Sequence, residues 1–187
     1  QQLDDRAAAE AEAQLSLAYS GVRFRQGRLH DAIKWAHRAE ALARQLDDAR
    51  SLAHSAYLLT AGYAMLRRPE VALYDQISLP LFEELGDLVG QGNVLNNLGV
   101  NARDDSKWTE ALDYYERSRN IRIEVGDVAG AAAATLNIAE ILSYQGHLEQ
   151  AEELFLDAIR SCRRIGYEIG HAWAQCNLGR LYAREKN

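Results

Sequence analysis

The sequence predicts an all-α solenoid of antiparallel helix pairs, because three markers return along it in one register. One is a helix-ending motif, at Leu46-Asp47-Asp48, Leu85-Gly86-Asp87, Val125-Gly126-Asp127 and Ile165-Gly166-Tyr167. Another is an alanine early in an apolar stripe, at Ala32, Ala72, Ala111 and Ala151. The third is an asparagine before an apolar and a small residue, at Asn97-Leu98-Gly99, Asn137-Ile138-Ala139 and Asn177-Leu178-Gly179. Each returns every 39 or 40 residues, which indicates stacked repeats.

The register divides the chain into repeats at about residues 4–46, 47–85, 86–125 and 126–165, with a partial repeat at 166–187. We expect two helices in each complete repeat, followed by one C-terminal helix from Glu168 to about Arg184. No segment alternates apolar and polar residues with period two, so no strands are predicted. Residues 1–187 are expected to form one solenoid domain. Since the chain begins without methionine and in helix-like sequence, we expect it to be part of a longer protein.

The expected turns coincide with glycine, aspartate and proline. Within repeats they fall at Gln26-Gly27, Asp104-Asp105-Ser106 and Gln145-Gly146. Between repeats, Gly86 and Gly126 suit the left-handed conformation that follows a helix, and Asp87 and Asp127 can cap the next helix. Pro69 is expected in the first turn of its helix. Pro80 is expected to kink or interrupt a helix running from about Glu70 to Leu85.

The fourth repeat shows the helical period most clearly. Its second helix has apolar residues three or four positions apart, with acidic residues between them, which predicts one buried face. The apolar positions are Leu148, Ala151, Leu154, Phe155, Ala158, Ile159, Cys162 and Ile165. The preceding stretch from Ala131 to Tyr144 is apolar on more than one face, as expected of a helix between two neighbours. The C-terminal helix would leave an apolar face uncovered, formed by Trp173, Leu178, Leu181 and Tyr182. Either truncation of a longer chain after this helix or dimerisation through it would explain such a face.

Composition excludes several classes of protein. With 48% hydrophobic residues the chain can form a core, and its interspersed charges leave no apolar run long enough to cross a membrane. A net charge of −6 disfavours direct binding to nucleic acid. The two cysteines, Cys162 and Cys176, form no disulfide framework, and the N-terminus carries no secretory signal. We therefore expect a cytoplasmic protein.

No catalytic, metal or cofactor motif is present in the sequence. The five histidines lie outside any HExxH motif or zinc spacing. Adjacent carboxylates such as Asp47-Asp48 cannot face each other on a helix. Gly90-Gln91-Gly92 lacks the third glycine and the preceding strand of a dinucleotide site. The expectation is a protein that is not an enzyme and that needs no metal or cofactor.

The repeat positions resemble the tetratricopeptide repeat. The third repeat carries the pattern at Leu95, Leu98, Gly99, Ala102, Ala111 and Tyr115, and the fourth at Thr135, Ile138, Ala139, Leu142, Ala151, Phe155 and Ala158. The first two repeats depart from it, with Ser20 and Thr60 at the small-residue position. The repeat length resembles the longer variant found in kinesin light chain and in bacterial regulators. This resemblance implies a right-handed α-α superhelix that binds a peptide or another protein.

Two phrases, LFEELGDLVGQGNVLNNLGVNA and the stretch from Gly126 to Tyr167, resemble the C-terminal repeats of large bacterial signalling proteins. Those proteins join such repeats to an ATPase module and to a class III nucleotide cyclase or a LuxR-type DNA-binding domain. The implied function is a regulatory or sensory segment that binds a protein in signal transduction. The alternatives are a self-associating structural module, or the regulatory region of a cyclase or transcriptional regulator whose output domain is absent here.

The first helices of the repeats should line a groove, and a stripe at i, i+4, i+7 and i+11 through the asparagine gives its candidate residues. An asparagine amide can pair with a partner's backbone, and the family resemblance agrees, but it can equally tie neighbouring helices together. Three such bonds contribute roughly 3 kcal/mol, whereas micromolar affinity needs about 8, so side-chain anchors must add the rest. Tyr144 and Trp173 can equally well pack in the core as contact a partner. The predicted partner-binding residues are Tyr57, Met65, Asn93, Asn97, Asn137, Glu140, Tyr144, Trp173, Asn177 and Arg180.

Overall fold

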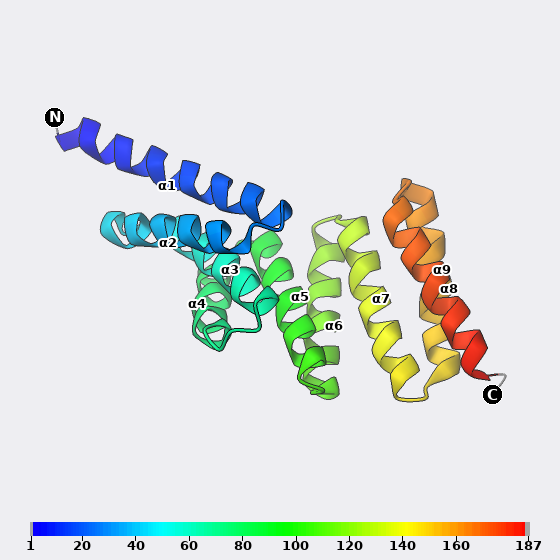
Figure 1. Ribbon diagram of the computed structural model, residues 1–187. Helices are drawn as coiled ribbons and strands as arrows, with labels where there is room; N and C mark the ends of the chain where they lie inside the picture. The colour runs from blue at the N-terminus through cyan, green and yellow to red at the C-terminus, as the bar shows by residue number, and fades with distance from the viewer. Residues whose placement is uncertain (1, 186–187) are drawn as a thin grey trace. The chain divides into compact units, whose positions relative to one another are not determined.

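The computed structural model describes residues 2–185, and the regular structure in that range is entirely α-helical (Figure 1). The side chains of residues 2–4, 72 and 185 lie outside the description. None of the helices in residues 2–185 is long and apolar enough to cross a membrane. The helices are α1 (Gln2–Arg25), α2 (Leu29–Leu46), α3 (Ala49–Met65), α4 (Val71–Glu84), α5 (Leu88–Asp104), α6 (Trp108–Glu124), α7 (Val128–Tyr144), α8 (Leu148–Ile165) and α9 (Glu168–Glu185).

The helices fall into two compact units, residues 1–94 and 95–187, and the division lies inside α5. In the first unit each of α1 to α4 packs against the next, and α1 also contacts α3. In the second unit α6 to α9 pack in the same sequential way, and α7 also contacts α9. In each unit, two helices that are separated by one helix along the chain therefore also contact each other, as the first helices of stacked helix pairs do. The expectation of a single domain over residues 1–187 stays a prediction.

The turns that separate the repeats have the predicted chemistry. Gly86 and Gly126 adopt φ angles of 63° and 75°, in the left-handed region that favours glycine. After α6, the Asp127 N–H donates to the Arg122 carbonyl at 2.8 Å and the Gly126 N–H donates to the Ile123 carbonyl at 3.1 Å. This pair of bonds is a Schellman motif, which satisfies the last carbonyls of the helix. The predicted glycine positions are confirmed.

The aspartates after these glycines cap the following helices. The Gly90 N–H donates to Asp87 Oδ1 at 2.9 Å, and the Gly130 N–H donates to Asp127 Oδ1 at 2.9 Å. Each carboxylate thus satisfies a backbone donor that has no partner inside its helix. The predicted capping roles of both aspartates are confirmed.

Pro69 differs from its prediction, and Pro80 differs from one of the two outcomes expected of it. Pro69 lies in the turn before α4, which begins at Val71, and not in the first turn of that helix. The helix continues through Pro80 to Glu84, so the expected interruption does not occur, while the alternative of a kink stays a prediction. Tyr74 and Phe82, on either side of Pro80, are 7% and 1% exposed. Their burial stabilises both ends of α4 and offsets the hydrogen bond that proline cannot donate.

Core positions follow the predicted periods. The alanine marker is buried at Ala32, Ala111 and Ala151, while the Ala72 side chain lies outside the described part. In α7, residues 134–139 are all buried, as expected of a helix with neighbours on both sides. The buried face of α8 comprises Ala151, Phe155, Ala158 and Cys162, whereas the predicted core residue Ile165 is 41% exposed.

The apolar residues of α9 were expected to lie uncovered, and for three of them that prediction is wrong. Leu181 is 0% exposed and belongs to a core cluster with Leu136 and Phe155. Trp173 and Leu178 pack against the same cluster. The reason is that α7 and α8 both contact α9 and cover this face within the unit. The large apolar groups that α9 exposes among the described residues are Ile169, at 77%, and Tyr182, at 38%.

Replacement of Asp48 by alanine is expected to lower the free energy of unfolding by about 1 kcal/mol at neutral pH. Asp48 Oδ1 accepts bonds from the Arg50 and Ser51 N–H groups, both at 3.1 Å, at the start of α3. Burial works against ionisation, but the bonds from Ser51 and Arg50 outweigh it and lower the pKa of Asp48 below 3.8. The pKa of Asp48 is thus lower in the folded protein than in the unfolded chain. The cap therefore contributes its full stabilisation at a pH above the unfolded-state pKa, and this stabilisation is lost as the pH falls through the folded-state pKa.

Urea denaturation at several pH values measures this effect. The difference between the wild type and Asp48→Ala should shrink as the pH falls below about 4. Asp48→Asn is the matched control, because asparagine caps a helix about as well as aspartate but does not titrate. A difference that stays constant from neutral to acidic pH would contradict the assigned capping charge.

Candidate functional site

The candidate site lies in the second unit, on the C-terminal halves of α5, α7 and α9. Ala102 of α5 and Ile138 and Ile141 of α7 share a core cluster, which holds these two helices together. The contact of α7 with α9 brings the third helix alongside. We call the polar and aromatic groups that these helices present, namely Arg103, Glu140, Tyr144, Arg180 and Arg184, the inner-helix face.

Arg103 connects α5 to α7 through a carboxylate. Its Nη1 lies 3.3 Å from Glu140 Oε2, and its Nη2 lies 3.0 Å from Asp104 Oδ1. The side chains of Arg103 and Glu140 are 26% and 14% exposed, so solvent screens this pair only partly. Burial alone would lower the pKa of Arg103, but Tyr115 and the two carboxylates raise it above its ordinary value. The guanidinium therefore stays charged and fixes Glu140 in position.

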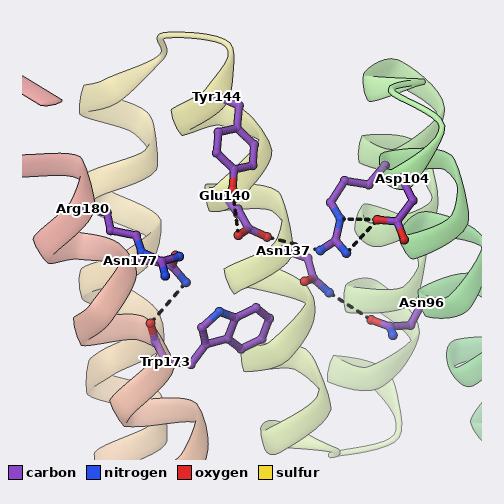
Figure 2. Close-up of polar contacts among 9 residues, drawn as sticks. Asn96, Asp104, Asn137, Glu140, Tyr144, Trp173, Asn177 and Arg180 are labelled. Carbon is purple, nitrogen blue, oxygen red and sulfur yellow. Dashed lines mark hydrogen bonds and ion pairs between the residues drawn. The ribbon is translucent and has the colours of Figure 1, made fainter. Parts of the chain in front are cut away.

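Tyr144 presents an aromatic ring whose orientation is fixed from two sides. Its hydroxyl donates to Glu140 Oε1 at 3.3 Å, as Figure 2 shows. The guanidinium of Arg184 lies 5.1 Å from the ring centroid, and its Nη1 donates to Ser143 Oγ at 3.4 Å. The ring is nevertheless 49% exposed. Interactions therefore run without a break from α5 through α7 to α9 and leave one aromatic ring accessible.

Two of the recurrent asparagines are engaged inside the unit. The Asn137 amide donates to Asn96 Oδ1 on α5 at 3.3 Å, and the Asn177 amide donates to the Trp173 carbonyl on its own helix at 3.2 Å (Figure 2). Both residues are 5% exposed. For Asn137 the geometry matches the alternative in which the amide ties neighbouring helices together. Arg180, which is exposed, donates from Nη1 to Asn177 Oδ1 at 3.4 Å.

Asn97 differs from the other two asparagines. Its side chain is half-buried, and within residues 2–185 its amide makes no hydrogen bond. One turn later on α5, the buried Asn101 Nδ2 also has no partner in the described part of the chain. The part-exposed Asn97 amide can offer donors and an acceptor to a partner's backbone, whereas the Asn101 nitrogen is buried and out of a partner's reach. Asn97 is thus the asparagine whose geometry best suits the predicted contact.

The remaining predicted residues belong to the first unit. Met65 is 65% exposed at the end of α3, whereas Tyr57 and Asn93 are half-buried. The His54 ring, also on α3, packs edge-on against Phe82, with the ring centroids 5.0 Å apart. Burial lowers the pKa of His54. The role of Met65, Tyr57 and Asn93 in binding stays a prediction.

Sequence reasoning did not select Arg103 or Asn96 as site residues. Arg184 stands at the same repeat position as Tyr144 and Asp104, so the stripe through the recurrent asparagine already included it. Arg103 lies one residue away from the predicted stripe and reaches Glu140 because its side chain is long. Asn96 also precedes the stripe by one residue, and no spacing rule indicates its bond to Asn137.

Comparisons with known proteins support the fold. Residues 90–164 match the tetratricopeptide repeat family. Aspartyl phosphate phosphatase F from Bacillus subtilis superposes with a TM-score of 0.81 at 16% identity, over 88% of this chain and 44% of that protein. BtubC (BKLC) from P. vanneervenii gives 0.73 at 20% identity, over 82% and 64%. A kinesin light chain with nearly identical TPR-like repeats from Podosopora anserina gives 0.71 at 14% identity, over 97% and 88%.

At these identities the likeness concerns the fold alone, and the predicted all-α fold of TPR-like helix pairs is confirmed. The chain spans less than two thirds of the length of the first two of these proteins. No curated protein matches its sequence.

Proposed function

We propose that this chain is a non-catalytic scaffold that binds a segment of another polypeptide at the inner-helix face. The observation that carries the proposal is the exposed Tyr144 ring, which Glu140 and Arg184 hold in one orientation. Tyrosine and arginine are the residue types that most often dominate binding energy at protein interfaces. A ring that is already fixed in the free protein loses little conformational entropy when a partner covers it.

The charges around Tyr144 suit a partner with both polar and apolar groups. Arg180 and Arg184 are exposed cations on α9, and Glu140 is a largely buried carboxylate on α7. Trp173 packs partly against the core and remains half-exposed, so part of its surface can contact a partner as well. Asn97 on α5 adds an amide that makes no hydrogen bond within the described part of the chain. An apolar residue over the Tyr144 ring, next to carboxylates or backbone carbonyls, would match this arrangement.

A peptide selected from a displayed library against the whole chain, followed by calorimetric titration of variants, tests the proposal. Tyr144→Ala should weaken binding by about thirtyfold, which corresponds to the roughly 2 kcal/mol typical of an interface hot spot. The matched control is Tyr182→Ala, because Tyr182 is also a part-exposed tyrosine, at 38%, whose hydroxyl donates to a glutamate, here Glu152. The control should bind within about twofold of the wild type.

We also infer that the scaffold is the regulatory or sensory segment of a larger bacterial signalling protein in the cytoplasm. The support is the resemblance of its third and fourth repeats to such proteins, together with cysteines that are both free, Cys162 buried and Cys176 exposed. The complete reading frame tests this inference. A cyclase or DNA-binding domain beside the repeats supports it, and a reading frame without any output domain contradicts it.

Homodimerisation through α9 is the second candidate, and one observation favours it. Ile169, at 77% exposure, is the most exposed large apolar residue among those described. Fewer apolar residues of α9 are available for such a dimer than the sequence indicated, because Leu181 and Trp173 pack inside the unit. If the candidate is correct, sedimentation of the wild type should show association that Ile169→Glu abolishes, and a wild type that stays monomeric at all concentrations would exclude it.

A further inference from the structure

A second surface feature lies at the opposite end of α7 from the inner-helix face. A groove of about 460 Å³ opens between the C-terminal halves of α6 and α8, over the N-terminal half of α7. Its floor is small and apolar and includes Ala132, Leu154 and Ala158. Its rim carries polar donors from two helices, namely Arg119 and Asn120 of α6 and Ser161 and Arg164 of α8. The volume lies within the range usual for ligand sites.

The donors at the rim are not engaged elsewhere. Within residues 2–185, the side chains of Arg119, Asn120, Ser161 and Arg164 make no hydrogen bond or ion pair. Arg122, in contrast, is held by Asp127, with Nη1 at 2.5 Å from Oδ2. Among the residues that line the groove, Asp157 is the single carboxylate, and Arg160 pairs with it at 3.3 Å. Two unpaired guanidinium groups therefore face the groove in a chain whose net charge is −6.

Exposed apolar side chains lie beside these donors. Ile123 is 63% exposed and Val128 is 38% exposed, and both line the groove. Exposed apolar groups next to unpaired polar donors are the usual composition of a surface that a partner covers. Because the cations flank an apolar strip, a ligand that matches both must carry apolar groups between negative charges.

We propose that this groove, the α6–α8 groove, binds an acidic segment of another polypeptide with apolar side chains between its carboxylates. The carboxylates would pair with Arg119 and Arg164, and the apolar side chains would cover the alanine floor and Ile123. The simplest other explanation for Arg164 is that it complements the dipole at the C-terminus of α8. Arg163 lies in the same last turn, so it would serve that purpose equally well, but it does not line the groove.

The difference between these two arginines provides a matched test. The probe is a short fluorescein-labelled peptide of glutamate and leucine, titrated against the whole chain by fluorescence anisotropy. Arg164→Glu should weaken its binding by about tenfold or more, whereas Arg163→Glu, with the same change in charge, should change it by less than about twofold. Neither arginine belongs to the inner-helix face, so a loss in Arg164→Glu that Arg163→Glu does not share assigns the peptide to the α6–α8 groove.

Further probes and variants separate the alternatives. Ser161→Trp fills the groove without a change of charge and should also weaken binding, while thermal unfolding confirms that each variant folds. A control peptide with serine in place of leucine should bind more weakly, and one with lysine in place of glutamate should not bind. Equal loss in the two arginine variants, equal binding of the serine peptide, displacement by inorganic phosphate, or no binding by the wild type would each overturn the proposal.

Discussion

Phe155→Ala is expected to lower the free energy of unfolding by about 3–5 kcal/mol, the usual cost of deleting a buried aromatic side chain. Phe155 is 1% exposed and lies in a cluster with Leu136, Ala139 and Leu181, which come from α7 and α9. Its removal would leave a cavity where three helices meet, and backbone packing would close that cavity only in part. Urea denaturation followed by circular dichroism measures the loss.

Leu156→Ala is the control for Phe155→Ala. Leu156 follows on the same helix and also loses a large apolar side chain, but it is 36% exposed. Alanine has a high helix propensity, so this change should cost less than about 1 kcal/mol. Losses of equal size at the two positions would show that α8 does not present the assigned face to the core.

Gly99→Ala and Gly179→Ala should change stability in opposite directions, although the two glycines occupy equivalent repeat positions. An added Cβ at Gly99 would lie 2.6 Å from the buried Tyr115 ring, so that ring or α5 must shift. Overpacking of this kind costs about 1–3 kcal/mol. At Gly179 a Cβ would meet no atom within 4 Å. Alanine there should stabilise the helix by about 0.5–1 kcal/mol.

Thermal unfolding of both variants beside the wild type measures this difference. The helical gain from alanine is the same at both positions, so each variant serves as the control for the other. Tyr115→Leu in the Gly99→Ala background should recover part of the lost stability, because it removes ring atoms that would collide. A stabilising Gly99→Ala would contradict the close packing of α5 against α6 that this structure describes.

The order of the helices and their ends could be predicted from the sequence, because local chemistry determines them. Gly126 has to adopt a left-handed conformation, and Asp127 has to cap α7, whatever the rest of the chain does. The interruption expected at Pro80 does not occur, because the burial of Tyr74 and Phe82 overrides a local preference. The coverage of α9 was predicted wrongly because it depends on how closely α7 and α8 approach that helix.

The candidate site could be predicted only in part. Tyr144, Glu140 and Arg180 follow from the repeat register, since equivalent positions on stacked helices share a face. Two features could not be predicted from spacing, because they depend on where long side chains end. They are the pairing of Arg103 with Glu140 and the bond from Asn137 to Asn96. The α6–α8 groove was also missed. Residues from three helices line it, and no spacing along the chain indicates that they meet.

The measurement that tests the central claim most directly is the affinity of a library-selected peptide for Tyr144→Ala relative to Tyr182→Ala. Both tyrosines are part-exposed and donate to a glutamate, and only Tyr144 belongs to the inner-helix face. If a partner covers that face, Tyr144→Ala binds about thirtyfold more weakly than the wild type while Tyr182→Ala binds almost as tightly. Equal affinities in the two variants, or no selectable peptide at all, would contradict the claim that this scaffold binds polypeptide there.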